Sequence, residues 1–283
     1  MALYLEQFQK HHDFPKQDAV WQDYIICYTP RSGSHLLGHT LKQTNVLGFP
    51  LEYFNPVNLP EWQKRFGTEG ILDTYREIQR HRTSPNGCFG CKLSYRQFKK
   101  IMQRHKFEDF FSSNCKFIFV RRRDLIAQAV SLAKMWTTGS AISSVNPTQE
   151  PIYNRQLIEK ACELIARENA CWEILFARRR CQYIEVYYED FAKDLNLTVS
   201  DVTSFLNIEI PRDFKVSASS LPEKQRDKIN QIWKEKFFNE IDNSGYETEI
   251  NWLEQKESAQ REPSLREILG FLVKKTKRKL PFI

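Results

Sequence analysis

The side chains best suited to chemistry lie in a short turn at residues 30–35, which reads Pro-Arg-Ser-Gly-Ser-His. The turn joins an apolar run, residues 24–28, to a segment whose leucines have helical spacing. The first N–H groups of a helix lack partners within the helix, and the helix dipole adds positive potential there. Gly33 allows close backbone approach, and Arg31 supplies a permanent charge. The turn therefore predicts a phosphate or sulfate site, with an ordinary strand-to-helix turn as the alternative.

A second junction of the same kind follows a second apolar run, residues 115–120. Three arginines, 121–123, lead from it into a segment of helical spacing at 125–136. We expect Arg123 and Ser131 to converge on one anionic group, although a solvated basic corner would carry the same arginines. In a parallel sheet both junctions lie at the carboxyl ends of the strands, where ligands bind. The pair predicts a ligand with two anionic groups.

The first turn is not an ATP-binding Walker A loop. That loop requires two glycines and a lysine in a fixed pattern, whereas this turn has one glycine and no lysine. A metal-dependent nucleotide kinase or NTPase on a P-loop-like fold is therefore an alternative rather than the first choice. A noncatalytic binder of nucleotides or nucleic acid is another alternative, because the net charge is +7. No zinc finger, ribonucleoprotein motif or basic zipper is present, so we expect no nucleic-acid partner.

Strand and helix patterns alternate from residue 22 to about residue 206, which favours an α/β domain with a parallel sheet. The longest helical pattern, at 153–178, has a stripe that includes Glu168 and Trp172 and is interpreted as a core-packing face. Another strand is expected at 183–187. These elements would place both junctions at one edge of the sheet.

The two junctions together resemble the phosphate sites of sulfotransferases that use 3′-phosphoadenosine 5′-phosphosulfate (PAPS), and more narrowly those of the Stf0-type, trehalose 2-sulfotransferase-like family. The likeness covers about residues 22–240 in collinear order. Its further blocks are at 48–54, 90–93, 128–131, 188–191, 225–226 and 233–237. The resemblance implies a P-loop-like three-layer sandwich in which helices flank a central parallel sheet. It also implies an enzyme that uses PAPS as co-substrate without a metal, and it allows a homodimer.

The resemblance assigns the donor site residue by residue. The residues expected to bind PAPS are Arg31, Ser32, Gly33, Ser34, His35, Arg123, Ser131 and Tyr188. Arg31 would also stabilise the leaving phosphate. His35 stands where the family usually has threonine, so it would bind phosphate as imidazolium or serve as a neutral filler. Tyr188 would contact the adenine or close the sheet.

The resemblance also points to Glu52 as the general base, because the family carries a glutamate in the block that matches residues 50–54. We expect its apolar neighbours to raise the pKa of Glu52, which a base requires. In the alternative interpretation Glu52 pairs with an arginine and only orients its loop. Lys92 is a further catalytic candidate, either beside the sulfuryl group or in a salt bridge. The small-residue segment 137–154 departs from the family pattern and is predicted to select the acceptor.

Composition sets the remaining expectations. A length of 283 residues with 41% hydrophobic residues predicts a single sulfotransferase domain at 1–283, with its core at 22–240 and a basic, helical extension at 241–283. Seven scattered cysteines predict reduced thiols, and the histidines show no metal-binding spacing, so we expect no metal site. No signal peptide or transmembrane run is evident, which predicts a cytoplasmic protein. The acceptor would be a small polar molecule such as a carbohydrate, glycolipid or natural product, sulfated on a hydroxyl, amine or guanidine.

Overall fold

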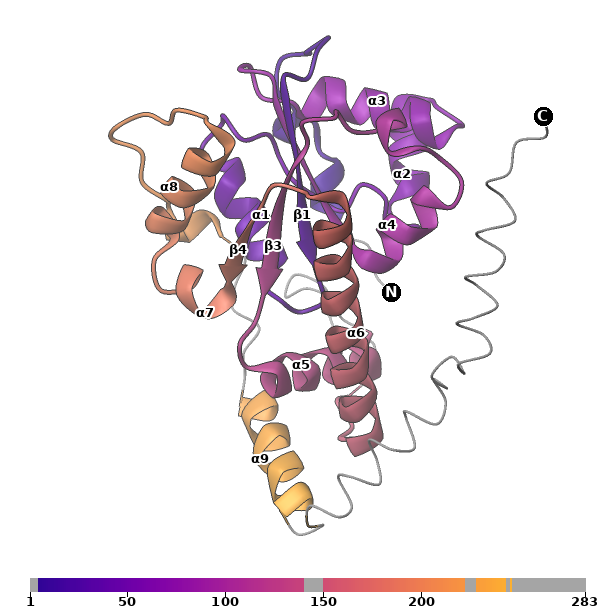
Figure 1. Ribbon diagram of the computed structural model, residues 1–283, viewed down its shortest axis with the longest axis vertical. Coiled ribbons are helices and arrows are strands. Elements are labelled where there is room, and N and C mark those ends of the chain that lie inside the picture. The colour runs from indigo at the N-terminus through magenta and orange to yellow at the C-terminus, as the bar shows by residue number, and fades with distance from the viewer. Residues whose placement is uncertain (1–4, 140–149, 222–227, 243–244, 246–283) are drawn as a thin grey trace, which may run out of the picture. The chain divides into compact units, whose positions relative to one another are not determined.

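The computed structural model describes residues 5–139, 150–221, 228–242 and 245. Its central feature is a four-stranded parallel sheet (Figure 1). The strands are β1 (Gln22–Tyr28), β2 (Cys88–Ser94), β3 (Lys116–Arg121) and β4 (Tyr183–Tyr187), in the spatial order β2-β1-β3-β4. In the register of the sheet Tyr24 lies opposite both Gly90 and Lys116. The apolar runs near 24, 115 and 183 are thus confirmed as strands.

Helices cover both faces of the sheet and complete the three layers (Figure 1). One face is covered by α1 (Ser34–Lys42), α7 (Tyr188–Phe191) and α8 (Leu195–Leu206). The other is covered by α2 (Leu59–Phe66), α3 (Ile71–Arg82), α4 (Tyr95–Met102) and α6 (Arg155–Arg179). Helix α5 (Leu125–Thr138) packs against α6, and α9 spans Lys228–Asp242. Short 3₁₀ turns lie at Leu5–Phe8, Lys10–His12, Phe107–Asp109 and Ala218–Ser220. The expected three-layer α/β sandwich with a central parallel sheet is confirmed.

The two core layers follow from the alternation of side chains along β1. Ile25 and Cys27 point into the layer under α2, α3, α4 and α6, whereas Tyr24 and Ile26 point into the layer under α1 and α8. All four side chains are fully buried. Successive side chains of a strand point to opposite faces, so an unbroken apolar run is what a strand covered on both faces requires.

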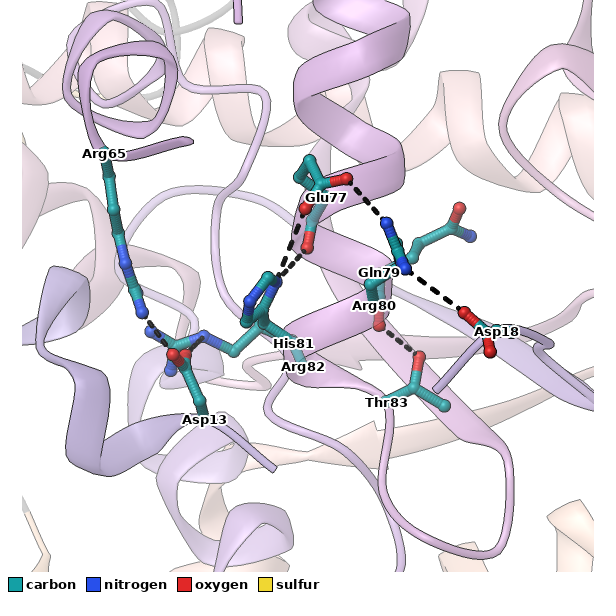
Figure 2. Close-up of polar contacts among 9 residues, drawn as sticks. All are labelled: Asp13, Asp18, Arg65, Glu77, Gln79, Arg80, His81, Arg82 and Thr83. Atoms are coloured by element: carbon teal, nitrogen blue, oxygen red, sulfur yellow. Dashed lines mark hydrogen bonds and ion pairs between the residues drawn. The ribbon is translucent and has the colours of Figure 1, made fainter. Parts of the chain in front are cut away.

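The N-terminal segment is fixed to the sheet's α2–α3 side by a buried ionic cluster (Figure 2). Arg82, which is fully buried, donates from Nη2 to the Gln7 carbonyl at 2.8 Å and pairs with Asp13 at 3.3 Å. Asp13 also pairs with Arg65 of α2. Because a buried charge is costly unless it is paired, this cluster specifies where the first residues lie.

Residues 1–234 form one compact unit, and a second unit begins at Glu235. Of the second unit the structure describes only residues 235–242, at the end of α9, and residue 245. Most of the expected basic extension at 241–283 therefore lies outside the described residues. The single domain over the whole chain stays a prediction.

Candidate active site

The turn between β1 and α1 adopts the special backbone that its sequence suggested. Gly33 caps α1 with a φ of 89°, in the left-handed region that favours glycine. A Cβ at this position would lie 2.4 Å from Cδ2 of Tyr188 and 2.9 Å from Cζ of Phe191. Tyr188 therefore packs directly on the turn, which places it beside the expected donor phosphates.

Helix α5 brings the second junction against the first. Gln128 donates from Nε2 to the Thr29 hydroxyl and to the Pro30 carbonyl, both at 2.8 Å. Arg31 donates from Nε to the Ser131 hydroxyl at 2.9 Å. The side chains of Arg31 and Ser131, a hundred positions apart in sequence, thus meet at the carboxyl edge of the sheet.

The electrostatics around Arg31, Ser32, Arg122 and Ser131, called the donor corner below, suit an anion. Burial, followed by the neighbouring Arg122 guanidinium, lowers the pKa of Arg31 to about 10, so Arg31 stays charged at neutral pH. The Ser32 hydroxyl is fully buried and has no hydrogen-bond partner among the described residues. A buried donor without a partner is costly, and two close cations repel each other. An anionic group bound here would relieve both costs.

Arg123 does not join this corner. Its guanidinium makes two hydrogen bonds to the Asp190 carboxylate, at 2.8 and 2.6 Å, and its side chain is half exposed. Arg122 is the arginine beside Arg31: it stacks 4.7 Å from the centre of the Tyr188 ring, its Nε lies 3.7 Å from the Glu189 carboxylate, and 13% of its side chain is exposed. The expected convergence of Arg123 with Ser131 is therefore absent from the described structure. The sequence alone does not indicate which of three consecutive arginines points toward Arg31.

Glu52 lies in a polar cluster at the ends of β1 and β2. Its carboxylate lies 3.5 Å from Nζ of Lys92 and accepts hydrogen bonds from Asn55, at 3.0 Å, and from the Tyr28 hydroxyl. The side chain of Lys92 is 2% exposed, whereas 27% of the Glu52 side chain stays accessible. A substrate can therefore reach the carboxylate but not the buried lysine stem.

The expected rise in the pKa of Glu52 is wrong. Burial does raise this pKa, but Lys92, Asn55 and Tyr28 stabilise the carboxylate more, so the pKa lies below its ordinary value. Burial lowers the pKa of Lys92, and Glu52 partly restores it. Of the two roles considered for Lys92, the structure contains the salt bridge.

The approach of α1 to this cluster requires a glycine. A Cβ at Gly38 would lie 2.6 Å from the Pro50 carbonyl oxygen and 3.7 Å from Cδ of Lys92. The backbone N–H of Lys92 in turn donates to the Leu51 carbonyl at 2.8 Å. The segment that carries Glu52 is thereby held between α1 and the edge strand β2.

His35 and His39 form a neutral pair on α1, with ring centres 4.5 Å apart. Burial, followed by the charges of Lys92 and other neighbours, lowers the pKa of His35 well below its ordinary value. The same causes lower the pKa of His39 to about 4. At neutral pH His35 therefore faces the donor corner as imidazole, not as the imidazolium considered from the sequence.

The neutral state of His39 predicts acid sensitivity of the fold. The folded pKa is about 4 against an unfolded value near 6.5, so the folded state binds fewer protons. His39 thus contributes stability above pH 6.5, and up to about 3 kcal/mol is lost as the pH falls through 4. Urea unfolding of His39→Gln between pH 7 and 4.5 should show a shallower loss of stability than the unaltered protein. A His105→Gln control should keep the full slope, and equal slopes in all three proteins would contradict the prediction.

One group of described residues has the composition of a metal site. Potential ligand atoms of Glu6, His11 and His12 all lie within 4.8 Å of one another. Burial, followed by the charge of Arg82, lowers the pKa of His12 to about 3, so the surroundings also disfavour a bound cation. The sequence analysis expected no metal, and that expectation stays a prediction.

Two further points bear on the expected site. Within the described part of the chain, the helices are too short or too polar to cross a bilayer. Most of the segment predicted to select the acceptor, residues 140–149, lies outside the described residues.

Comparison with known proteins establishes the class. Residues 23–240 match the Stf0 sulphotransferase family, so the chain belongs to this family and is a sulfotransferase. The family inferred from the ordered motifs is confirmed. Trehalose 2-sulfotransferase of Mycolicibacterium smegmatis is 24% identical over 261 residues, which cover 78% of this chain and 96% of that protein. The trehalose 2-sulfotransferase of Mycobacterium tuberculosis is also 24% identical, over 80% of this chain and 97% of that protein.

Solved structures of sulfotransferases are also similar to this chain. The sulfotransferase domain of the Synechococcus PCC 7002 olefin synthase aligns with a TM-score of 0.46 and 15% identity over 79% of this chain and 90% of that domain. A sulfotransferase from Alicyclobacillus acidocaldarius aligns with a TM-score of 0.46 and 16% identity over 78% of this chain and 93% of that protein.

Proposed function

We propose that this sulfotransferase transfers a sulfuryl group from PAPS to a hydroxyl of a small polar acceptor. The observation that carries the donor assignment is the corner at the first turn: Arg31 lies beside Arg122, and the same turn contains the buried Ser32 hydroxyl and the glycine cap of α1. This corner fits phosphate groups. A carbohydrate is the first acceptor class to test, because the two mycobacterial relatives are named for trehalose.

The donor would be held by both junctions. The turn from Arg31 to Ser34 would bind the 5′-phosphosulfate, with the α1 N-terminus adding positive potential. Arg122 and Ser131 would bind the 3′-phosphate. Arg31, bonded to Ser131, would stabilise the charge that develops on the leaving phosphate, and its fixed position lowers the cost of reorganisation during the reaction.

The transfer requires one proton acceptor. The acceptor oxygen attacks the sulfur atom, the sulfur–oxygen bond to the phosphate breaks in line, and 3′-phosphoadenosine 5′-phosphate (PAP) leaves. The hydroxyl proton passes to Glu52, which is ionised and accessible. Lys92 would lie beside both the carboxylate and the sulfuryl group.

The Lys92–Glu52 pair offers a way to adjust the base. A carboxylate next to an ammonium group is a weak proton acceptor, because the positive charge stabilises its ionised form. The sulfuryl and phosphate oxygens of bound PAPS would compete for Lys92. As Lys92 shifts toward the donor, the proton affinity of Glu52 rises, so the donor would prepare the base for the acceptor.

The donor assignment is tested by ligand-induced stabilisation and by two neighbouring arginines. PAP, added without a metal, should raise the melting temperature more than ATP with magnesium or a short DNA duplex does. Arg122→Ala should weaken PAP about 10- to 150-fold, equivalent to about 1.5–3 kcal/mol, because a charge-assisted contact is lost. Adenosine 5′-phosphate, which lacks the 3′-phosphate, should lose much less. Isothermal titration of both ligands measures the difference.

Arg123→Ala serves as the matched control. Arg123 is already bound to Asp190, so its removal should change PAP affinity by less than about threefold. A larger loss of PAP affinity in Arg123→Ala than in Arg122→Ala would show that Arg123, not Arg122, binds the 3′-phosphate. Failure of PAP to bind the unaltered protein would refute the donor assignment itself.

A further inference from the structure

Helix α6 carries one acidic side chain on its buried face. The other buried residues of this face are Ile158, Ala161, Ile165, Trp172 and Phe176, all apolar. Glu168 interrupts them and is only 7% exposed. Burial raises the pKa of Glu168, and Arg96 and Arg167 offset part of that rise. A packing role alone does not explain a carboxyl group at this position, because a leucine would fill the space without the cost of desolvation.

Glu168 and its neighbour present acceptor atoms without donors. Oε2 of Glu168 and Oδ1 of Asn169 are both buried, and neither has a hydrogen-bond partner among the described residues. Buried polar atoms in folded proteins are nearly always paired, and an unpaired one destabilises the fold. The unpaired carboxylate oxygen of Glu168, on the buried face of α6, therefore points to a ligand that donates a hydrogen bond.

The position of Glu168 along α6 places it near the catalytic cluster. Trp172 packs against Tyr95, with ring centres 5.4 Å apart, and Tyr95 begins α4 directly after β2 ends. Glu168 lies one helical turn before Trp172, on the same buried face of α6. Tyr28, at the end of β1, donates a hydrogen bond to Glu52, and the charge of Glu168 contributes to the raised pKa of Tyr28. Glu52 and Glu168 thus both lie close enough to influence one tyrosine.

We propose that Glu168 binds a second hydroxyl of the acceptor while Glu52 acts on the hydroxyl that is sulfated. The inference rests on the proposed function and specifies its substrate: a polyol with at least two hydroxyls, such as a sugar. Glu168 is then a specificity-determining residue. A molecule with a single hydroxyl would leave the buried carboxylate oxygen of Glu168 unpaired and would bind weakly.

The test compares Glu168→Leu and Glu168→Gln with the unaltered enzyme in transfer from radiolabelled PAPS to trehalose and a panel of simple sugars. With the best sugar of the panel, Glu168→Leu should raise the acceptor KM about 10- to 100-fold, and Glu168→Gln should raise it less. The KM for PAPS and the affinity for PAP should stay unchanged. Glu173→Gln is the matched control, since Glu173 is an exposed acid of the same helix, and it should behave like the unaltered enzyme.

A second measurement needs no acceptor. Removal of an unpaired buried carboxyl group should raise the melting temperature of the ligand-free protein by about 2–4 °C in Glu168→Leu. A fall in melting temperature would show a structural role for Glu168 and overturn the inference. An unchanged acceptor KM, or sulfation confined to amines, would overturn it as well. Absence of both PAP binding and transfer in the unaltered enzyme would instead refute the proposed function, so the two failures are distinguishable.

Discussion

Glu52→Gln is expected to lower kcat by about two to four orders of magnitude, the usual contribution of a general base. Glutamine keeps the shape of the side chain, and its single carbonyl oxygen still accepts hydrogen bonds, but it cannot accept the proton of the attacking hydroxyl. PAP binding should barely change, because PAP lacks the sulfuryl group and the proposed phosphate ligands are Arg31, Ser32, Arg122 and Ser131 rather than Glu52. Turnover at saturating donor and acceptor measures the effect, and Glu69→Gln, at an exposed acid far from the cluster, is the control.

The pH profile provides an independent check of the same residue. Because the pKa of Glu52 lies below its ordinary value, the carboxylate is ionised above that pKa and becomes protonated only as the pH falls through it. The acid limb of kcat/KM for PAPS, which reports the free enzyme, should therefore lie below the ordinary carboxyl range, and it should disappear in Glu52→Gln. Near-normal turnover in this variant would make Glu52 a positioning residue and would require another base.

Gly33→Ala is expected to weaken PAP by about 100-fold or more and to lower turnover with it. The new methyl group would meet the Tyr188 and Phe191 rings at 2.4 and 2.9 Å, and alanine tolerates a φ of 89° poorly. Either the turn or Tyr188 must move, and a displacement of about 1 Å at such a site costs about 100-fold. Titration with PAP and steady-state kinetics measure the loss.

Gly67→Ala is the control that separates the effect of the steric clash at Gly33 from the effect of backbone strain. Gly67 also has a positive φ, 66°, but a Cβ there would meet nothing within 4 Å. This variant should lose about 1 kcal/mol of unfolding free energy and keep its affinity for PAP. If Gly33→Ala binds PAP as well as Gly67→Ala does, the close approach of Tyr188 does not matter for donor binding.

Much of the fold was predictable because each part of it has a local cause. Apolar runs of five to seven residues, ended by turns, indicate strands buried on both faces, and the long stripe near 153–178 indicates a packing helix. The helix is observed at Arg155–Arg179. The turn at 30–35 was predictable for the same reason, since its glycine and its place between strand and helix determine its backbone.

The parts that were not predictable depend on contacts between distant residues. The choice between Arg122 and Arg123 is made by Asp190 and Tyr188, almost seventy positions away. The pKa of Glu52 depends on Lys92, which approaches Glu52 only after β2 pairs with β1. The apolar neighbours of Glu52 in the sequence therefore suggested a raised pKa that the folded structure does not have. Glu168 resembled a member of a packing stripe, because helical spacing indicates which face is buried but not which polar atoms on it lack partners.

The two hydrogen bonds of Gln128 also bear on how such an enzyme changes its substrate over evolutionary time. They fasten the first turn to α5, so Arg31, Ser32, Arg122 and Ser131 are held together by elements that precede Gly139, and the Tyr188 ring is added from later in the chain. Residues between Gly139 and Tyr188 can then vary without a compensating change at the phosphates. A lineage can therefore exchange one sulfated metabolite for another and retain the same activated donor. The departure from the family pattern at residues 140–141 falls in this permissive part of the sequence.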